Sequence, residues 1–125
     1  MRVLITGASR GIGRAIAERL AAPGTTLLLH GRDRQALDAV AATVRGAGAA
    51  ARTFSADLAD AEATVGLATG VAAALADPAL DDTPPGDRSL EVLIHNAGMA
   101  VVRPLEEITL EQWQRSLAVG VTAPF

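Results

Sequence analysis

The sequence predicts an α/β protein built on a doubly wound parallel sheet, and three observations point to it. Short β-rich runs alternate with helical patterns along the chain, as expected when crossover helices join parallel strands. Two strand candidates contain continuous apolar runs, at residues 27–29 and 92–94, which is typical of strands covered on both faces. A glycine-rich turn lies between the first strand and the first helix.

The predicted strands are residues 2–6, 25–30, about 50–55 and 90–95. The first helix follows the glycine-rich turn, and its apolar face is expected to be Ile12, Ile16 and Leu20. In the second helix, Asp33 is a plausible N-cap and residues 46–48 (GAG) supply a stop. Its apolar positions follow the i, i+3, i+4, i+7 pattern and are Leu37, Val40, Ala41 and Val44.

The third and fourth helices are read from weaker patterns. The third has an expected apolar face of Val65, Ala68, Ala72 and Leu75, although glycines at 66 and 70 weaken it. In the fourth, Thr109 and Gln112 have the spacing of a capping box. Trp113, Leu117 and Val121 follow at helical spacing, and Trp113 is interpreted as a core residue.

These elements predict one domain over residues 1–125, with the strand order 3-2-1-4. The Asp- and Pro-rich segment 77–89 is interpreted as a solvated loop rather than a cation site or a domain boundary. Strand four would then be an apolar edge, which proteins usually protect. We therefore expect a chain truncated after about four strands, with possible self-association through strand four.

Composition excludes several classes of partner. The net charge is −3, and all 11 basic residues are arginine with no basic run, so nucleic acid and anionic membranes are poor candidates. The absence of cysteine excludes disulfides and thiolate chemistry. The most apolar helical stretch, residues 65–76, is too short to span a bilayer. A cytoplasmic location is the expectation.

The turn at residues 6–13 (TGASRGIG) has the features of a phosphate site. A phosphate needs exposed backbone N–H donors, the positive end of a helix and no obstructing side chains. Gly7 permits a tight turn, Gly11 lets a pyrophosphate approach, and Gly13 lets the helix lie against the strand. The alternative is a glycine-rich turn that binds nothing, and the strand–turn–helix context argues against it.

Taken together, four segments make the chain resemble the short-chain dehydrogenase/reductase family. They are TGASRGIG at residues 6–13, HGR at 30–32, ADL at 56–58 and NAG at 96–98, in the family's order and spacing. The resemblance spans the whole chain. It implies a Rossmann-type fold and a nicotinamide dinucleotide as cofactor. A flavodoxin-like domain is a weaker alternative because it does not explain the last three segments.

The resemblance also assigns roles to residues. Those of the glycine-rich turn would hold the phosphates, namely Gly7, Ser9, Arg10, Gly11, Ile12 and Gly13. Asp57 would hydrogen-bond the adenine, with Leu58 beside the ring. The residues after strand four would line the nicotinamide-side ribose and fix strand four against strand one, namely Asn96, Ala97 and Gly98.

The choice of cofactor follows from charge. An acidic residue at the end of strand two would favour NAD(H), but Gly31 stands there and Arg32 follows. Arg10 is expected nearby, and two guanidinium groups suit a 2′-phosphate. NADP(H) is therefore favoured over NAD(H). The alternative is that both are ordinary solvent-exposed arginines.

His30 and His95 have no evident acidic or nucleophilic partner and are interpreted as structural.

The residues that would perform catalysis are missing. In the family a Tyr donates the proton, a Lys four residues on lowers its pKa, and a Ser polarises the substrate oxygen. This sequence contains no Tyr and no Lys, and Gly120 stands where the family has an Asn. We predict no catalytic residue and no metal site in this chain.

The favoured hypothesis is a truncated NADP(H)-dependent oxidoreductase of small carbonyl or alcohol substrates. The alternative is a non-catalytic dinucleotide-binding module or a degraded gene product.

Overall fold

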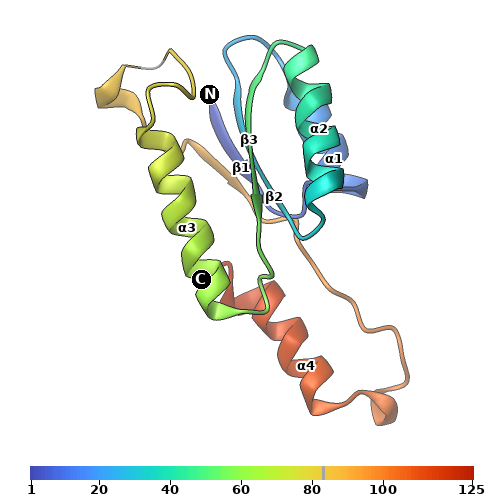
Figure 1. Cartoon of the computed structure of the whole chain (residues 1–125). Helices are drawn as coiled ribbons and strands as arrows, with labels where there is room; N and C mark the ends of the chain where they lie inside the picture. The colour runs from blue at the N-terminus through green and yellow to red at the C-terminus, as the bar shows by residue number, and fades with distance from the viewer. Residues whose placement is uncertain (83) are drawn as a thin grey trace.

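A parallel four-stranded sheet forms the centre of the computed structural model, which describes residues 1–82 and 84–125 (Figure 1). The strands are β1 (Arg2–Ile5), β2 (Thr26–Gly31), β3 (Ala50–Ser55) and β4 (Val92–Ile94). They are hydrogen-bonded in the order β3-β2-β1-β4, which confirms the predicted topology. β4 is shorter than the predicted residues 90–95 and pairs in parallel register with β1 from Val3 to Ile5.

Helices cover both faces of this sheet. α1 (Gly11–Leu20) and α2 (Arg34–Gly46) lie on one face, and α3 (Ala61–Ala76) lies on the other (Figure 1). Successive side chains of a strand point to opposite faces of the sheet, so alternate residues pack against the helices on either side. Val3 and Ile5 contribute to the core under α1 and α2, whereas Leu4 contributes to the core under α3.

The second helix agrees with its prediction in detail. The Asp33 carboxylate accepts a hydrogen bond from the Ala36 N–H at 3.0 Å, so it caps α2 as expected. The helix ends at Gly46, and Gly48 beyond it has a φ of +91°, a conformation that favours glycine. All four predicted core positions are buried, namely Leu37, Val40, Ala41 and Val44.

The predicted face of α1 is wrong at one residue, and the predicted face of α3 is wrong at most of its residues. Ile12 is 73% exposed, because the tight contact of α1 with the sheet is made by Gly13 and Ala17, while Ile16 and Leu20 are only partly buried. On α3, the predicted face of Val65, Ala68, Ala72 and Leu75 is buried only at Leu75. The observed buried residues are Leu67, Val71, Ala74 and Leu75. This helix is apolar nearly all round, so its sequence allows more than one buried face.

The interpretation of Trp113 as a core residue is also wrong. Trp113 lies on α4 (Leu110–Leu117), which extends from the end of the sheet (Figure 1), and its side chain is 53% exposed. Leu117 and Val121 are exposed too, because no element of the described chain covers this face. The capping box of Thr109 and Gln112 is present as predicted. α4 continues into one π-helical turn, Ala118–Thr122.

The segment between α3 and β4 is less open than a solvated loop. It contains a short helical turn, Pro85–Asp87. Leu80 is buried, and the Asp81 carboxylate pairs with the buried Arg2 guanidinium at 2.9 Å and accepts from the Thr26 hydroxyl at 2.6 Å. The hydrogen bond to Asp81 raises the pKa of Arg2. The segment is therefore fastened to the amino-terminal edge of the sheet.

β4 forms an apolar edge of the sheet. Val92 is 37% exposed and Leu93 is 45% exposed, and β4 has β1 as its neighbour in the strand order. Within residues 1–82 and 84–125, no helix combines the length and the apolar character that crossing a membrane requires.

Candidate functional site

A cavity of about 430 Å³ lies at the carboxyl ends of the strands. This is where doubly wound sheets bind their ligands, and the volume is within the range of small-molecule sites. Every site residue predicted from the sequence lines it, except Gly13. They are Gly7, Ser9, Arg10, Gly11, Ile12, Arg32, Asp57, Leu58, Asn96, Ala97 and Gly98.

The glycine-rich turn takes a conformation that other residues rarely adopt. Gly7 has a φ of +69° and Gly11 a φ of +55°, both in the left-handed region. A Cβ at Gly7 would lie 2.9 Å from Ala97 Cα, so this turn passes close to the residues that follow β4. A Cβ at Gly11 would meet no atom within 4 Å, so the turn is open on the side of the cavity.

Gly13 has a packing role instead. A Cβ at this position would lie 2.2 Å from the Gly7 carbonyl oxygen and 2.5 Å from Asn96 Nδ2. No side chain fits there, which agrees with the expectation that Gly13 lets the helix lie against the strand. It does not line the cavity.

The amino terminus of α1 supplies hydrogen-bond donors to the cavity. The first N–H groups of a helix have no partner within the helix. Arg10 occupies the N-cap position without making a side-chain cap, and the first turn carries no acidic residue. These donors and the positive end of the helix are therefore available for an anion at Ser9, Gly11 and Ile12, which all line the cavity.

Asn96 joins the ends of β1 and β4 beside this turn. Its Nδ2 donates to the Thr6 carbonyl at 3.0 Å and to the Gly7 carbonyl at 3.1 Å. The Thr6 hydroxyl accepts from the Asn96 and Ala97 N–H groups at 3.1 Å and 3.0 Å. The expected fixing of strand four against strand one is thus present, and it holds residues 96–98 at the wall of the cavity.

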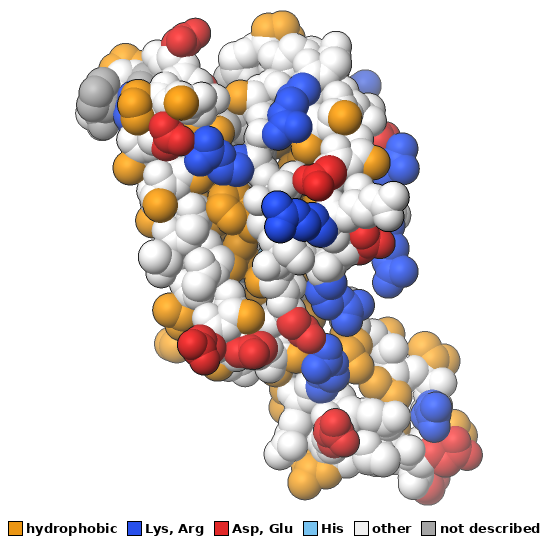
Figure 2. Space-filling model, in the orientation of Figure 1, with side chains coloured by type: hydrophobic (Ala, Val, Ile, Leu, Met, Phe, Trp, Pro, Cys, Tyr) orange, Lys and Arg blue, Asp and Glu red, His pale blue; other side chains and the backbone are white. Residues whose placement is uncertain are grey.

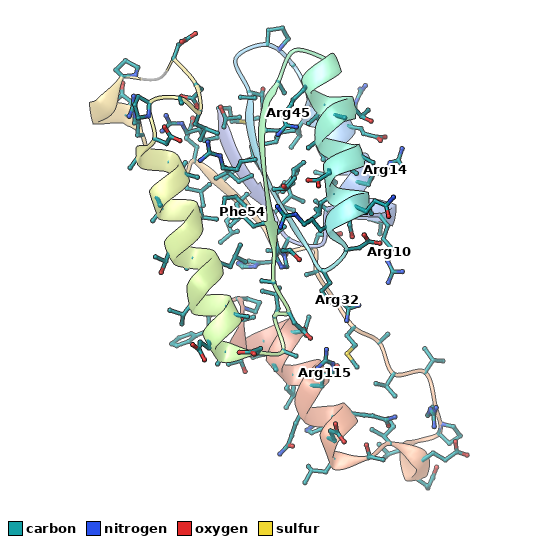
Figure 3. All side chains as sticks on the ribbon, in the orientation of Figure 1. Arg10, Arg14, Arg32, Arg45, Phe54 and Arg115 are labelled. Atoms are coloured by element: carbon teal, nitrogen blue, oxygen red, sulfur yellow. The ribbon has the colours of Figure 1, made fainter. Side chains whose placement is uncertain are left out.

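Two arginines lie at the rim of the same cavity. Figure 3 shows Arg10 before α1 and Arg32 after β2, at the end of the sheet where the cavity opens. In the part of the chain that is described, neither has an ion-pair partner. Figure 2 shows basic side chains on the α2 side of the molecule with acidic ones among them, and further acidic side chains at the amino-terminal end of α3. Asp33 and Asp57 line the cavity too, so a favourable site for an anion is confined to the part near Arg10 and Arg32.

Gly31 is the last residue of β2, directly before Arg32, and is packed closely against Ser9 and Leu37. A Cβ there would lie 3.1 Å from Ser9 Oγ and 3.3 Å from Leu37 Cδ2. A side chain at this position would require Ser9 or Leu37 to shift slightly. Because the residue is glycine, the end of β2 carries no carboxylate.

Asp57 at the far wall is held by two donors. The Ala59 N–H donates to Oδ1 at 3.0 Å, and Arg115 Nη2 on α4 donates to Oδ2. The Ala59 N–H and then the Arg115 guanidinium lower the pKa of the Asp57 carboxyl, which is therefore ionised near neutral pH. Sequence reasoning missed Arg115, because it lies 58 positions from Asp57 and no local pattern links them.

His30 lies on the floor of the cavity and is 2% exposed. Its Nε2 lies 3.1 Å from the Ala56 carbonyl oxygen and donates to it, whereas Nδ1 is buried without a partner in the described residues. Burial lowers the pKa of His30, so the imidazole is neutral near pH 7. Met99 and Val119 also line the cavity, and sequence reasoning did not single them out.

Comparison with known proteins agrees with this geometry. The family model described as short chain dehydrogenase matches residues 1–125. Gluconate 5-dehydrogenase of Gluconobacter oxydans (strain 621H) is 35% identical over 124 residues, which is 99% of this chain and 44% of that protein. D-threitol dehydrogenase of Mycolicibacterium smegmatis is 32% identical over 122 residues, which is 98% of this chain and 42% of that protein.

Solved structures give the same result. A metagenomic short-chain oxidoreductase in complex with NADP superposes with a TM-score of 0.82 at 34% identity, covering 99% of this chain and 51% of that one. An angucycline C-6 ketoreductase with bound NADP superposes with a TM-score of 0.86 at 35% identity, covering 99% of this chain and 46% of that one. The chain thus spans about half the length of these relatives, or slightly less.

Proposed function

The chain belongs to the short-chain dehydrogenase family, and on that premise we propose that these 125 residues form the NADP(H)-binding part of an oxidoreductase. The observation that carries the proposal is the cavity at the carboxyl ends of the strands. The glycine-rich turn at the start of α1, Arg10 and Arg32 all line this one cavity. Their N–H donors match a dinucleotide with an additional phosphate.

We assign parts of the cavity to parts of the cofactor as follows. The turn from Gly7 to Ile12 would hold the pyrophosphate, and Arg10 and Arg32 would hold the 2′-phosphate. Asp57 and Leu58 would contact the adenine. The residues after β4 would contact the nicotinamide-side ribose, namely Asn96, Ala97 and Gly98. The lack of a carboxylate at Gly31 and the NADP or NADPH in several structural relatives support NADP(H) over NAD(H).

When bound, NADP(H) supplies hydride exchange with the carbonyl or alcohol carbon of a small substrate. That reaction needs a proton donor at the substrate oxygen. The 125 residues contain neither Tyr nor Lys, and Gly120 has no side chain to relay a proton. We therefore expect these residues to bind the cofactor without turning over a substrate by themselves.

Calorimetric titration with NADPH and NADH tests the proposal. We expect NADPH to bind more tightly than NADH, and Arg32→Ala to weaken NADPH binding about tenfold, the effect of losing one charge-assisted contact. NADH binding should change little. Arg19→Ala is the matched control, because Arg19 is exposed on the last turn of α1 and does not line the cavity.

Two results would contradict the proposal. A folded protein that binds neither cofactor would show that the glycine-rich turn is only structural. If the protein bound NADH as tightly as NADPH and Arg32→Ala had no effect, the two arginines would not be contacts of the 2′-phosphate.

A further inference from the structure

Arg115 connects α4 to the wall of the cavity. It comes from the last turn of α4 (Figure 3). Its guanidinium pairs with the carboxylate of Asp57, which lies in the turn between β3 and α3. The two side chains are 41% and 39% exposed. An ion pair this open to water contributes little to folding stability, because water screens the attraction between the charges. Its effect should therefore be sought at the cavity rather than in the stability of the fold.

The pair leaves Asp57 able to accept further hydrogen bonds. A carboxylate has about four lone-pair sites on its two oxygens. Among the described residues, the Ala59 N–H uses one on Oδ1 and Arg115 uses one on Oδ2, so each oxygen can accept a further hydrogen bond. Two donors on opposite oxygens also fix the rotation of the carboxylate. Asp57 is thus held in one orientation while it lines the cavity.

We propose that Arg115 is a positioning residue for recognition of the adenine base. It holds the Asp57 carboxylate where a remaining lone pair accepts a hydrogen bond from the adenine amino group, and its charge offsets that of Asp57 near the cofactor phosphates. The inference rests on the proposed NADP(H) function. In this arrangement α4 influences which base of a dinucleotide the cavity binds. It does so through the contact between Arg115 and Asp57, which are far apart in the sequence.

Discrimination between two cofactors that differ only at the base tests this role. The probes are NADPH and its counterpart with unsubstituted purine, in which a hydrogen replaces the adenine amino group. Asp57 can accept a hydrogen bond from the amino group, whereas the unsubstituted purine offers no donor at that position. We expect the wild-type chain to prefer NADPH by about tenfold or more, the worth of a charge-assisted hydrogen bond.

Arg115→Gln should bring this preference close to unity, because the carboxylate is no longer held. Arg115→Lys should retain part of it, since the charge remains but the planar fork is lost. Arg52→Gln is the matched control. It breaks the Arg52–Asp77 pair, whose side chains are 41% and 35% exposed and lie outside the cavity, so the preference should be unchanged.

Thermal unfolding of each variant separates a positioning effect from a damaged fold, and Arg115→Lys keeps the test open if Arg115→Gln does not fold. A preference in folded Arg115→Gln equal to or above that of the wild type would overturn the inference and leave NADP(H) binding standing. A wild-type chain that binds neither probe would overturn the proposed function together with this inference.

Discussion

Replacing Gly13 with alanine tests most directly how α1 is seated on the sheet. The added Cβ would lie 2.2 Å from the Gly7 carbonyl oxygen and 2.5 Å from Asn96 Nδ2. Because nonbonded atoms prefer a separation of roughly 3.5 Å, α1 would have to move by about 1 Å. This movement would shift the backbone N–H groups at the start of α1 away from their positions at the cavity.

The expected magnitude follows from three effects. Overpacking costs about 1–3 kcal/mol. Losing a hydrogen bond from Asn96 Nδ2 to Gly7 costs about 1 kcal/mol more. The higher helix propensity of alanine offsets about 1 kcal/mol. We therefore expect Gly13→Ala to lower the free energy of unfolding by about 1–3 kcal/mol and to weaken NADPH binding.

Urea denaturation followed by circular dichroism measures this change, and Gly66→Ala is the matched control. Gly66 is an exposed position within α3, and a Cβ there would meet no atom within 4 Å. The control should gain about 1 kcal/mol from helix propensity. If Gly13→Ala were as stable as the wild type, or gained as much as Gly66→Ala, the close packing inferred for Gly13 would be refuted.

Two further predictions concern pH and association. Because burial lowers the pKa of His30, the unfolded chain binds a proton more readily than the folded protein near pH 6.5. The contribution of neutral His30 to the free energy of unfolding should thus be fully present above about pH 6.5 and be lost as the pH falls below it. His30→Phe should flatten the dependence of the thermal midpoint on pH in that range, and an unchanged slope would count against His30. We also expect the apolar edge at β4 to let two copies associate. Light scattering should show association that rises with concentration and is reduced by Leu93→Lys, whereas a sharp monomer peak for the wild type would exclude it.

The accuracy of the sequence-based predictions depended on how strongly each pattern excluded alternatives. α2 has apolar residues on one side and polar residues on the other, so its periodicity alone assigns Leu37 and Val44 to the core. α3 is rich in alanine and apolar on most sides. Its buried face was decided by the surface it meets, where Gly70 approaches the Phe54 ring, and the predicted Val65 points outward.

The candidate site shows the same division. Its residues follow the ends of parallel strands, and those ends lie at one edge of the sheet, so short sequence motifs are sufficient to place Gly11, Asp57 and Asn96 in one cavity. Local patterns say nothing about two side chains that meet across a long stretch of chain. The pairing of Asp57 with Arg115 and that of Arg2 with Asp81 belong to this second class.

The sequence by itself determined the order of strands and helices, the glycine-rich turn and the absence of Tyr and Lys, because these depend on residue type and on neighbours a few positions apart. Only the tertiary structure decided that Gly13 packs while Gly11 faces the cavity, that Ile12 and Trp113 are exposed, and that Arg115 holds Asp57. Burial and ion pairing depend on what the rest of the fold brings opposite a side chain, and that surface comes from residues distant in the sequence.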